Sequence, residues 1–279
     1  MRIVNSGEIT ETVKRLCIEA NYSLPQSIRE RISALSDEER WPLAREVLGN
    51  ITENYELAET KLRPICQDTG VVCVFLEIGQ DIHIEGGLSE AVDDGVRRGY
   101  AGGYLRASIA GDPLRRVNTG DNTPAMLYTE LTAGESLKIT VAPKGFGSEN
   151  MSRIKMLTPS DGVEGVIEFV LNTVAEAGPN PCPPIIAGVG IGGTFDKAAL
   201  LSKKALLRPA AQPNPDPYYA ALELELLDKL NGLGIGPQGF GGRTTALAVH
   251  IETLPTHIAG LPCAVNIGCH VTRHASVTI

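Results

Sequence analysis

The chain has 279 residues, and its 25 Lys and Arg against 33 Asp and Glu give a formal net charge of -8. No block of Lys or Arg supplies a phosphate-binding surface, which argues against nucleic acid as a partner. The N-terminus has no basic head followed by an apolar core, and no apolar run is long enough to span a bilayer. We therefore expect a cytoplasmic globular protein that does not bind membranes and keeps its six cysteines as reduced thiols.

The first sixty residues predict helices. Apolar residues recur at helical spacing from Ile9 to Ala20, and a second helical region runs from about Pro25 to Leu62. The elements that follow are, in order, a buried strand over 71–79, a helix over 88–101 and strands near 125–131 and 136–142.

A long helix is predicted over residues 162–177, where the apolar residues form one stripe. Asp161 and Glu164 before and within it have the spacing of a capping box. The remaining elements are a strand near 183–190, a helix over 195–206, a helix opened by Asp216 and Pro217 that runs to about Leu230, and a strand over 244–254.

This order of elements predicts an α/β fold with a helical N-terminal region and a mixed sheet. We expect one domain over residues 1–279, with the Pro-rich stretch 208–217 as a possible internal seam. Polar clusters fall in Gly-rich and Pro-rich loops, which we expect to converge on a cleft.

The six cysteines fall into two groups. Three lie in apolar segments and are expected to be small buried hydrophobes: Cys17, Cys73 and Cys263. The other three lie in polar turns shaped by Gly or Pro, where a thiolate can face a shared cavity: Cys66, Cys182 and Cys269. Three thiolates so far apart in sequence fit no zinc-finger spacing, but they fit an iron–sulfur cluster with one iron lacking a protein ligand. Such an iron is a Lewis acid toward a substrate oxygen.

Seven motifs occur in order along the chain: CQDTG at 66–70, NTGDNTP at 118–124, KGFGSEN at 144–150, NPCPP at 180–184, GVGIGG at 188–193, KKALLRP at 203–209 and LGIGPQGFGG at 233–242. Together they resemble the class I fumarases. The resemblance is closer to the α subunit of the two-subunit form, which is related to tartrate dehydratase α subunits. It extends to NIGCHVTRHA near the C-terminus and so covers nearly the whole chain.

The resemblance implies a four-iron, four-sulfur cluster held by Cys66, Cys182 and Cys269. It also implies that a small dicarboxylate substrate is contacted by Gln67, Asp68, Arg106, a backbone amide near Gly147, and His257. The implied reaction is the reversible hydration of fumarate to malate, with a tartrate dehydratase or another hydroxy-dicarboxylate dehydratase as the alternative. The family's β portion, which carries further substrate contacts and a proposed base, is absent from this sequence. We therefore expect a separate β subunit and a higher hetero-oligomer.

Each of these polar residues also has a structural interpretation. Asp68 is placed to deliver a proton to a leaving hydroxyl, but an Asp in a DTG sequence also caps a turn. Arg106 offers a planar fork for a carboxylate, or is a solvated or paired arginine. His257 could donate to the substrate or be a satisfied core histidine, and His270 could support the cluster or lie on the surface.

Two hypotheses from other classes remain. GVGIGG at 188–193 matches the dinucleotide fingerprint of a NAD-dependent oxidoreductase, since it lies between an apparent strand and an apparent helix. The acidic residue expected about 20 positions further on is missing, so we interpret these glycines as close packing near a site. The other hypothesis is a non-catalytic iron–sulfur scaffold or sensor. Arg243 and Arg273 lie in suggestive loops, yet either could be structural.

Overall fold

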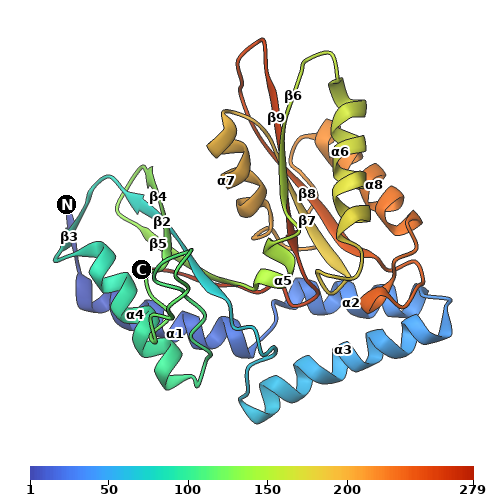
Figure 1. Ribbon diagram of the computed structural model, residues 1–279. Helices are drawn as coiled ribbons and strands as arrows, with labels where there is room; N and C mark the ends of the chain where they lie inside the picture. The colour runs from blue at the N-terminus through green and yellow to red at the C-terminus, as the bar shows by residue number, and fades with distance from the viewer. The chain divides into compact units, whose positions relative to one another are not determined.

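The computed structural model describes all residues from Met1 to Ile279 and has two compact units (Figure 1). Unit 1 comprises Met1–Pro25, Tyr55–Phe146 and Arg273–Ile279, and unit 2 comprises Gln26–Asn54 and Gly147–Thr272. The prediction of an α/β fold with a helical N-terminal region and mixed sheets is confirmed. No helix combines the length and the apolar character needed to cross a membrane.

Unit 1 is built on a four-stranded mixed sheet in the order β10-β5-β2-β4, beside a small parallel pair, β1 and β3. Strand β2 pairs parallel with β4 and antiparallel with β5, and β5 pairs antiparallel with β10. The elements of this unit are β1 (Arg2–Asn5), α1 (Ser6–Tyr22), β2 (Val71–Gly79), β3 (Ile82–Glu85), α4 (Leu88–Gly102), β4 (Met126–Thr132), β5 (Leu137–Lys144) and β10 (Ala275–Thr278).

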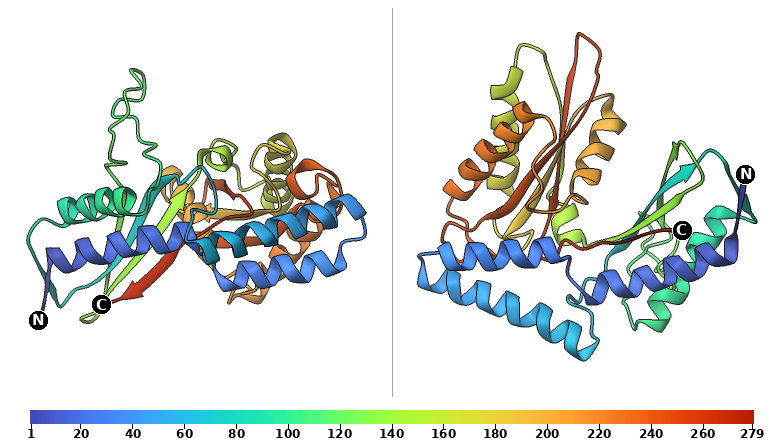
Figure 2. Two further views of the ribbon diagram at one scale, coloured as in Figure 1. Left: turned by 90° about the horizontal axis from the view of Figure 1, so that it is seen from below. Right: turned by 180° about the vertical axis from the view of Figure 1, so that it is seen from behind.

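Helices α1 and α4 pack closely against each other in unit 1, as two views show (Figures 1 and 2). Glycines in α4 permit this approach. A Cβ added at Gly95 would lie 2.7 Å from the Cβ of Val13, and one at Gly99 would lie 2.8 Å from the Cβ of Cys17. The Asn5 side chain caps the start of α1 by accepting from the Gly7 amide at 2.8 Å. The apolar stripe of α1 therefore becomes core.

Unit 2 contains a second mixed sheet, in the order β6-β9-β7-β8. Strands β7 and β8 are parallel, and β9 runs antiparallel to both β6 and β7. Its elements are α2 (Gln26–Glu38), α5 (Phe146–Glu149, largely in this unit), β6 (Arg153–Leu157), α6 (Gly162–Ala177), β7 (Ile185–Gly192), α7 (Phe195–Ala205), α8 (Pro217–Gly232), the 3-10 turn η1 (Pro237–Gly239), β8 (Ala246–Leu254) and β9 (Leu261–Gly268). Helix α3 (Pro42–Lys61) contributes residues to both units.

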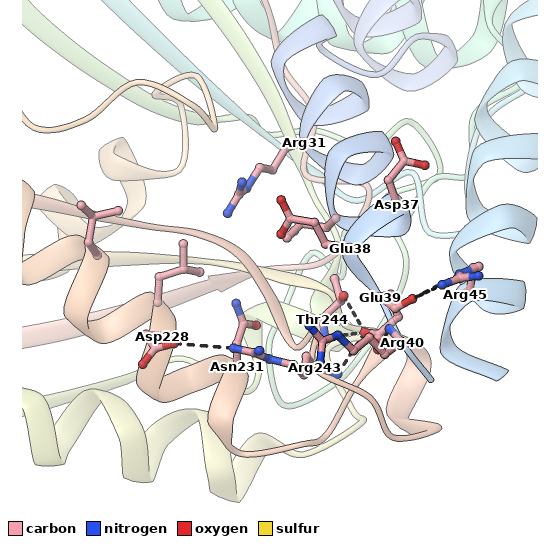
Figure 3. Close-up of a pocket in the computed structure, with 13 residues that line it drawn as sticks. Arg31, Asp37, Glu38, Glu39, Arg40, Arg45, Asp228, Asn231, Arg243 and Thr244 are labelled. Carbon is pink, nitrogen blue, oxygen red and sulfur yellow. Dashed lines mark hydrogen bonds and ion pairs between the residues drawn. The ribbon is translucent and has the colours of Figure 1, made fainter. Parts of the chain in front are cut away.

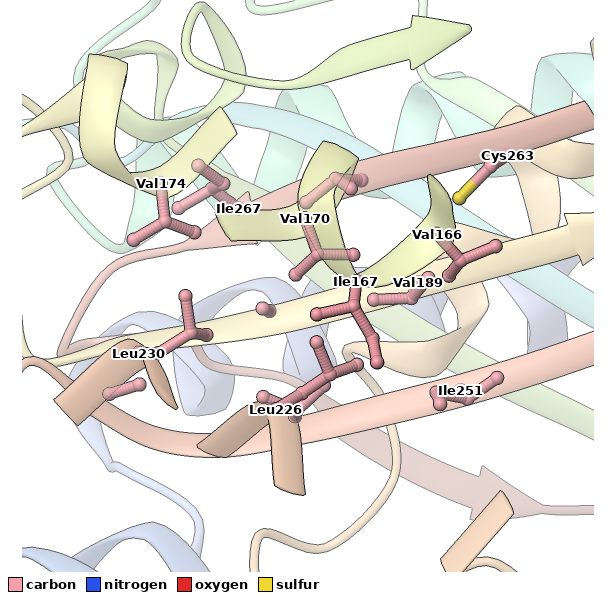
Figure 4. Packing of buried hydrophobic residues seen from close by; sticks show 14 of the residues in the cluster. Val166, Ile167, Val170, Val174, Val189, Leu226, Leu230, Ile251, Cys263 and Ile267 are labelled. Carbon is pink, nitrogen blue, oxygen red and sulfur yellow. The ribbon is translucent and has the colours of Figure 1, made fainter. Parts of the chain in front are cut away.

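Helices cover both faces of the sheet in unit 2, with α6 and α8 on one face and α7 on the other (Figures 1 and 2). The apolar stripe of α6 meets α8 and the sheet in one buried cluster that includes Val166, Val170 and Leu226 (Figure 4). Every residue of β7 is buried, which explains its continuous apolar sequence. On the α7 face, a Cβ added at Gly190 would lie 2.1 Å from the carbonyl oxygen of Ala198. Glycine is therefore required for the helix to lie this close.

Several predicted elements are confirmed with the same bounds. Residues 71–79 form β2 and residues 162–177 form α6. Asp216 caps α8 by accepting from the Tyr218 amide at 2.9 Å, with Pro217 in the first turn. The segment 208–217, where we predict a seam, joins α7 to α8 inside unit 2.

The capping box predicted at Asp161 and Glu164 is wrong. Asp161 itself has helical φ and ψ of -69° and -30°, and it makes no side-chain cap bond to the helix. Its carboxylate instead turns back and accepts from the amide of Thr158 at 2.6 Å and from the Thr158 hydroxyl at 2.8 Å. The side chain thus stabilises the preceding turn and does not cap the first helical amides.

Candidate functional site

The turn over residues 66–70 of unit 1 carries three of the predicted site residues. The Cys66 sulfur lies 3.4 Å from the Asp68 amide, which donates to it, and the same thiol lies 3.4 Å from the Gln67 side-chain oxygen. Amide donation to sulfur is a contact that stabilises a thiolate ligand and tunes a cluster. Cys66 is partly exposed, so its sulfur is accessible to a ligand.

Asp68 and Arg106 form an ion pair at the same turn. The Arg106 Nη2 lies 3.3 Å from Asp68 Oδ1, and Oδ1 also accepts from the Gly70 amide at 3.1 Å. The other carboxylate oxygen accepts from the Phe146 amide at 2.9 Å. The turn-capping interpretation of Asp68 is therefore confirmed, and the ion pair with Arg106 comes in addition to it. The Arg106 Nε also donates to Ser108 Oγ at 3.3 Å, yet the side chain stays 57% exposed and is accessible to a ligand.

The backbone of this turn is held by buried donors. Tyr100 donates from its hydroxyl to the Thr69 carbonyl at 2.6 Å, and Asn122 donates from its amide to the Gly70 carbonyl at 3.2 Å. Thr69 accepts from the Arg106 amide at 2.9 Å and donates back to the Arg106 carbonyl at 3.0 Å. Both Tyr100 and Asn122 are buried. They fix the turn and position the thiol and carboxylate that it carries.

Cys182 and Cys269 lie at the same end of two neighbouring strands, β7 and β9, in unit 2. Cys182 precedes β7 and Cys269 follows β9, and Ile186 pairs with Gly268 in the antiparallel register of these strands. The Cys182 carbonyl accepts from the His270 amide at 3.3 Å, and His270 Nδ1 lies 3.0 Å from the same oxygen. Two of the three predicted ligands are thus on adjacent loops joined by hydrogen bonds.

Cys182 has a backbone conformation that is rare for a side-chain-bearing residue. Its φ is +54°, in the left-handed region, which costs about 1 kcal/mol or more for a residue other than glycine. The side-chain nitrogen of Gln238 of η1 lies 3.1 Å from the same Nδ1, which either donates to the Cys182 carbonyl or accepts from Gln238, depending on the tautomer of the ring. This answers the question left open for His270, because its ring supports the loop of Cys182.

Gly147 and the residues around it lie beside the loop that carries Cys182. A Cβ added at Gly147 would lie 3.6 Å from the Asn180 carbonyl oxygen, in the loop that carries Cys182. Two residues further on, the Glu149 carboxylate accepts from Lys203 Nζ at 2.6 Å and from the Asn266 side chain at 3.1 Å. Sequence reasoning did not single out Glu149, Lys203 or Asn266. Their occurrence in KGFGSEN, KKALLRP and NIGCHVTRHA was the available signal.

His257 lies at the opposite end of the strands of the same sheet. It belongs to the exposed turn between β8 and β9, whereas Cys269 follows the far end of β9 (Figure 1). The Ala259 amide donates to His257 Nδ1 at 3.2 Å, so a neutral ring carries its proton on Nε2. The interpretation of His257 as a buried core histidine is therefore wrong. Within unit 2, the structure does not bring His257 to the two cysteines.

The exposure of the six thiols matches the division predicted from sequence. Cys17, Cys73 and Cys263 are buried, and burial raises the pKa of Cys17 and of Cys263 to about 12. By contrast, Cys182 is exposed and the two remaining thiols, of Cys66 and Cys269, are partly exposed. A group held by thiolates needs accessible sulfur atoms, and these three fit that requirement. Within each unit, no three Cys, His, Asp or Glu side chains gather as a complete metal site, so the three-cysteine ligand set stays a prediction.

Arg243 and Arg273, whose roles the sequence leaves undecided, have different surroundings. Arg273 is 4% exposed and donates to backbone and side-chain oxygens inside unit 1. Arg243 is 75% exposed and lies 3.8 Å from Asp228 at a cavity of about 660 Å³ in unit 2 (Figure 3). At that cavity the buried Glu39 accepts from the amides of Arg243 and Thr244 at 2.9 and 3.0 Å. None of the predicted site residues lines this cavity.

The GVGIGG segment is part of a strand and not a phosphate-binding loop. Most of it lies within β7, and Gly188 and Gly190 face the backbone of α7 at distances where any Cβ would clash. Gly192 and Gly193 have positive φ and adjoin Leu254 at the end of β8. Close packing therefore accounts for these glycines. This agrees with the interpretation based on the absence of the acidic residue that a dinucleotide site requires.

Comparison with known proteins covers nearly the whole chain. Residues 10–278 match the sequence model of a family described as "Fumarate hydratase (Fumerase)". A protein of Escherichia coli K12 named L(+)-tartrate dehydratase subunit alpha is 33% identical over 277 residues, or 98% of this chain and 91% of that protein. A protein of Methanocaldococcus jannaschii, which bears the same name provisionally, is 42% identical over 275 residues, or 96% of each chain.

These similarities extend through every motif that carries the candidate site. The chain belongs to the class I fumarate hydratase family. Within that family of hydro-lyases, it is of the α-subunit type, because relatives matched over 91% and 96% of their length are named as α subunits.

Proposed function

We propose that this chain is the α subunit of an iron–sulfur hydro-lyase that removes water from a hydroxy-dicarboxylate, with L(+)-tartrate as the first candidate substrate. The observation that carries the proposal is the turn over 66–70, where a thiol, a carboxylate and a guanidinium meet. Cys66, Asp68 and Arg106 there supply a cofactor ligand, a proton-transfer group and a carboxylate-binding fork. This combination matches what dehydration of such a substrate requires.

Dehydration breaks the C–H bond beside one carboxylate and the C–O bond of the neighbouring hydroxyl. The electron pair of the C–H bond becomes the new double bond, and the departing hydroxide takes a proton to leave as water. Hydroxide is a poor leaving group, so the site needs an acid for the oxygen and a base for the carbon. In this proposal Asp68 is protonated in the substrate complex, gives its proton to the departing hydroxide and becomes a carboxylate. The base that takes the C–H proton is expected on the partner subunit.

Arg106 binds the substrate carboxylate in this proposal. Its side chain is more than half exposed, and it forms its ion pair with Asp68 at 3.3 Å. A substrate carboxylate that takes the guanidinium removes one of the two donors to Asp68 Oδ1. That oxygen is then available for proton transfer at the moment when substrate is bound.

The three accessible thiols, Cys66, Cys182 and Cys269, would hold a four-iron, four-sulfur cluster. A cluster with three thiolate ligands supplies one iron that acts as a Lewis acid on the substrate hydroxyl. The chain fixes the positions of the sulfur atoms through hydrogen bonds to the cysteine loops. The Asp68 amide donates to Cys66, and the His270 amide anchors the Cys182 loop. Gln67 and the Gly147 amide remain candidates for polar contacts to the substrate.

The choice between substrates rests on the relatives. Fumarate hydration is the reaction that the family name suggests, whereas the relatives matched over 91% and 96% of their length are named for tartrate. The tartrate reading is therefore the better supported of the two, and fumarate with malate is the second candidate. The α-subunit names of the relatives support a separate β subunit as partner.

The test is anaerobic reconstitution of the chain with its co-produced β partner, followed by parallel assays on L(+)-tartrate, malate, fumarate and mesaconate. We expect an oxygen-sensitive dehydratase with its highest kcat/KM on tartrate. Asp68→Asn should lower kcat by about 100-fold or more while the cluster absorbance remains, as expected for loss of a general acid. Asp81→Asn, at an exposed carboxylate of the same unit, is the matched control and should leave kcat unchanged.

Turnover of malate or fumarate with no activity on tartrate would move the assignment to fumarate hydratase. Activity that survives in air without iron, or an Asp68→Asn variant with normal kcat, would overturn the mechanism.

A further inference from the structure

We propose that residues 107–119, in the loop between α4 and β4, form a docking arm for the β subunit. At the tip of the arm, Leu114 with Arg115 and Arg116 enters an apolar pocket of that subunit bordered by acidic side chains. The inference rests on the proposed function, in which a β subunit completes the site at the turn over 66–70. The length, the exposure and the attachment of the arm lead to it.

The arm belongs to a long loop that no core covers. The loop joins α4, which ends at Gly102, to β4, which begins at Met126, and so exceeds the length of about 12 residues beyond which irregular loops are uncommon and usually functional. From residue 111 to residue 120 no side chain is buried. The left view of Figure 2 shows this loop standing out from the other elements of unit 1.

Local hydrogen bonds hold the shape of the arm. The Gly111 amide donates to the Val117 carbonyl at 2.8 Å, which closes the tip. Within the tip, the Asp112 carboxylate accepts from the amides of Leu114 and Arg115 at 3.0 and 2.6 Å. The arm is therefore ordered without packing against a core. A preorganised loop of this kind loses little conformational entropy when a partner binds it.

The side chains of the arm are unusual for a surface that faces only water. Leu114 is 91% exposed and Val117 is 69% exposed, while Arg115 and Arg116 are exposed and form no ion pair. Single exposed apolar side chains are common, but these two flank two unpaired guanidinium groups at the tip of one ordered loop. Arginine is enriched at interfaces, and acidic side chains on a partner would complement its charge.

The base of the arm is attached to the candidate site. The arm begins directly after Arg106, and at its other end lies Asn122, whose side chain is fully buried. The Asn122 Oδ1 accepts from the Ser108 amide at 2.7 Å, and its Nδ2 donates to the Gly70 carbonyl at 3.2 Å. One side chain therefore joins the arm to the turn over 66–70, and the two are held in a fixed arrangement.

This attachment makes the β subunit the occupant. Leu114 lies eight residues after Arg106, so the arm reaches less than about 30 Å from that residue. A folded domain of 100 residues is about 35 Å across. A β subunit that places its base at the turn is therefore wide enough to cover the arm as well. Contact with the arm would fix the position of that base relative to Arg106.

The test measures the dissociation constant between the anaerobically reconstituted α chain and the separately purified β subunit. Leu114→Asp places a charge in the apolar contact and should raise the dissociation constant by about 30-fold or more. Arg115→Gln with Arg116→Gln should raise it by about 10-fold at low ionic strength, and the difference should shrink in about 0.5 M salt. Urea unfolding of these α chains should match that of the unchanged chain, because the arm buries no side chain at its tip.

Two control variants match these changes. Leu131→Asp alters a side chain that is 79% exposed at the end of β4 far from the arm, and it should leave the dissociation constant unchanged. Arg15→Gln with Arg98→Gln removes the same charge from exposed positions on α1 and α4, and should also leave it unchanged. Equal affinity of Leu114→Asp and the unchanged chain would overturn the proposal, as would an equal loss in Leu131→Asp. If the unchanged α chain bound no β subunit, the proposed function would fail and this inference with it.

A second measurement identifies the partner directly. The photo-reactive residue p-benzoylphenylalanine replaces Val117 in one α chain and Leu131 in another, and each chain is illuminated in the α–β assembly. The chain changed at Val117 should give a covalent product that contains α and β, and the chain changed at Leu131 should give none. A product of two α chains from position 117 would assign the arm to a second copy and overturn the proposal, and so would the absence of any product.

Discussion

Arg273 supports the backbone of Asp68 across 205 residues of sequence. Its Nη2 donates to the Asp68 carbonyl at 2.7 Å, and its Nε lies 3.2 Å from the Asn21 side-chain oxygen at the end of α1. The guanidinium is 4% exposed, so it is part of the core of unit 1 and not a substrate contact. It links the C-terminal segment, the first helix and the turn that presents Cys66 and Asp68.

Arg273→Met should destabilise unit 1 by about 3 kcal/mol, because the buried Asn21 oxygen and the partly buried Asp68 carbonyl lose a charged donor. The measurement is the free energy of unfolding in urea, taken without cluster so that cofactor binding does not contribute. Arg243→Met is the matched control, since that side chain is 75% exposed and its nearest carboxylate is 3.8 Å away. It should change the free energy by less than about 0.5 kcal/mol. Equal effects of the two changes would contradict the buried role of Arg273.

Gly190→Ala should destabilise unit 2. The added Cβ would lie 2.1 Å from the Ala198 carbonyl oxygen, so α7 must move away from β7. Overpacking of this kind costs about 2 kcal/mol, which urea unfolding resolves. Gly232→Ala is the control, because no heavy atom lies within 4 Å of the Cβ position at that residue. A neutral Gly190→Ala variant would mean that the strand and helix are less closely packed than described.

Periodicity predicted the elements whose apolar residues follow a single pattern. The stripe of 162–177 and the continuous apolar run of 71–79 gave α6 and β2 with their observed bounds. Short strands such as β1 and β10 were not predicted, because four residues carry too little pattern. The capping error at Asp161 has a similar origin, since sequence spacing does not reveal that the residue itself is helical.

The candidate site was predictable only as far as residue types and local turns allow. The division of the cysteines followed from their neighbours, and burial agrees with it. The ion pair of Asp68 with Arg106 joins residues 38 apart, and the buried position of Arg273 depends on contacts with α1, so neither was visible in the sequence. Likewise, the separation of His257 from Cys269 follows from strand register, which one sequence does not specify.

His250 makes the stability of unit 2 depend on pH. Its side chain is 1% exposed, its Nδ1 lies 3.0 Å from the Ala205 carbonyl, and its Nε2 has no partner. Burial, with the nearby Arg208 charge, lowers the pKa of His250 from 6.5 to about 4. The unfolded chain therefore binds a proton between these two values that the folded chain does not. Stability is fully present above pH 6.5 and falls as the pH drops toward 4.

The size of this effect is about 3 kcal/mol for a shift of this extent. Between pH 7.5 and pH 5, about 2 kcal/mol of it should be lost in urea unfolding of the cluster-free chain, and His250→Gln should remove this part of the pH dependence. Buried His274 of unit 1, whose pKa burial likewise lowers to about 4, keeps its own contribution in that variant. His83→Gln alters an exposed histidine and should leave the pH dependence as in the unchanged chain. Identical pH dependence in the His250→Gln variant would contradict the assignment.

The three accessible thiols should react before the three buried ones. Cys17, Cys73 and Cys263 are buried, and the raised pKa of Cys17 and Cys263 keeps both of these protonated at neutral pH, so they should resist alkylation in the folded chain. Iodoacetamide added to the cluster-free protein should label Cys66, Cys182 and Cys269, as read by peptide mass spectrometry. Anaerobic reconstitution with iron and sulfide before labelling should protect all three together, because one cluster takes all three sulfur atoms. Protection of only two of them, or rapid labelling of Cys263, would contradict the ligand set, whatever activity the assembly shows.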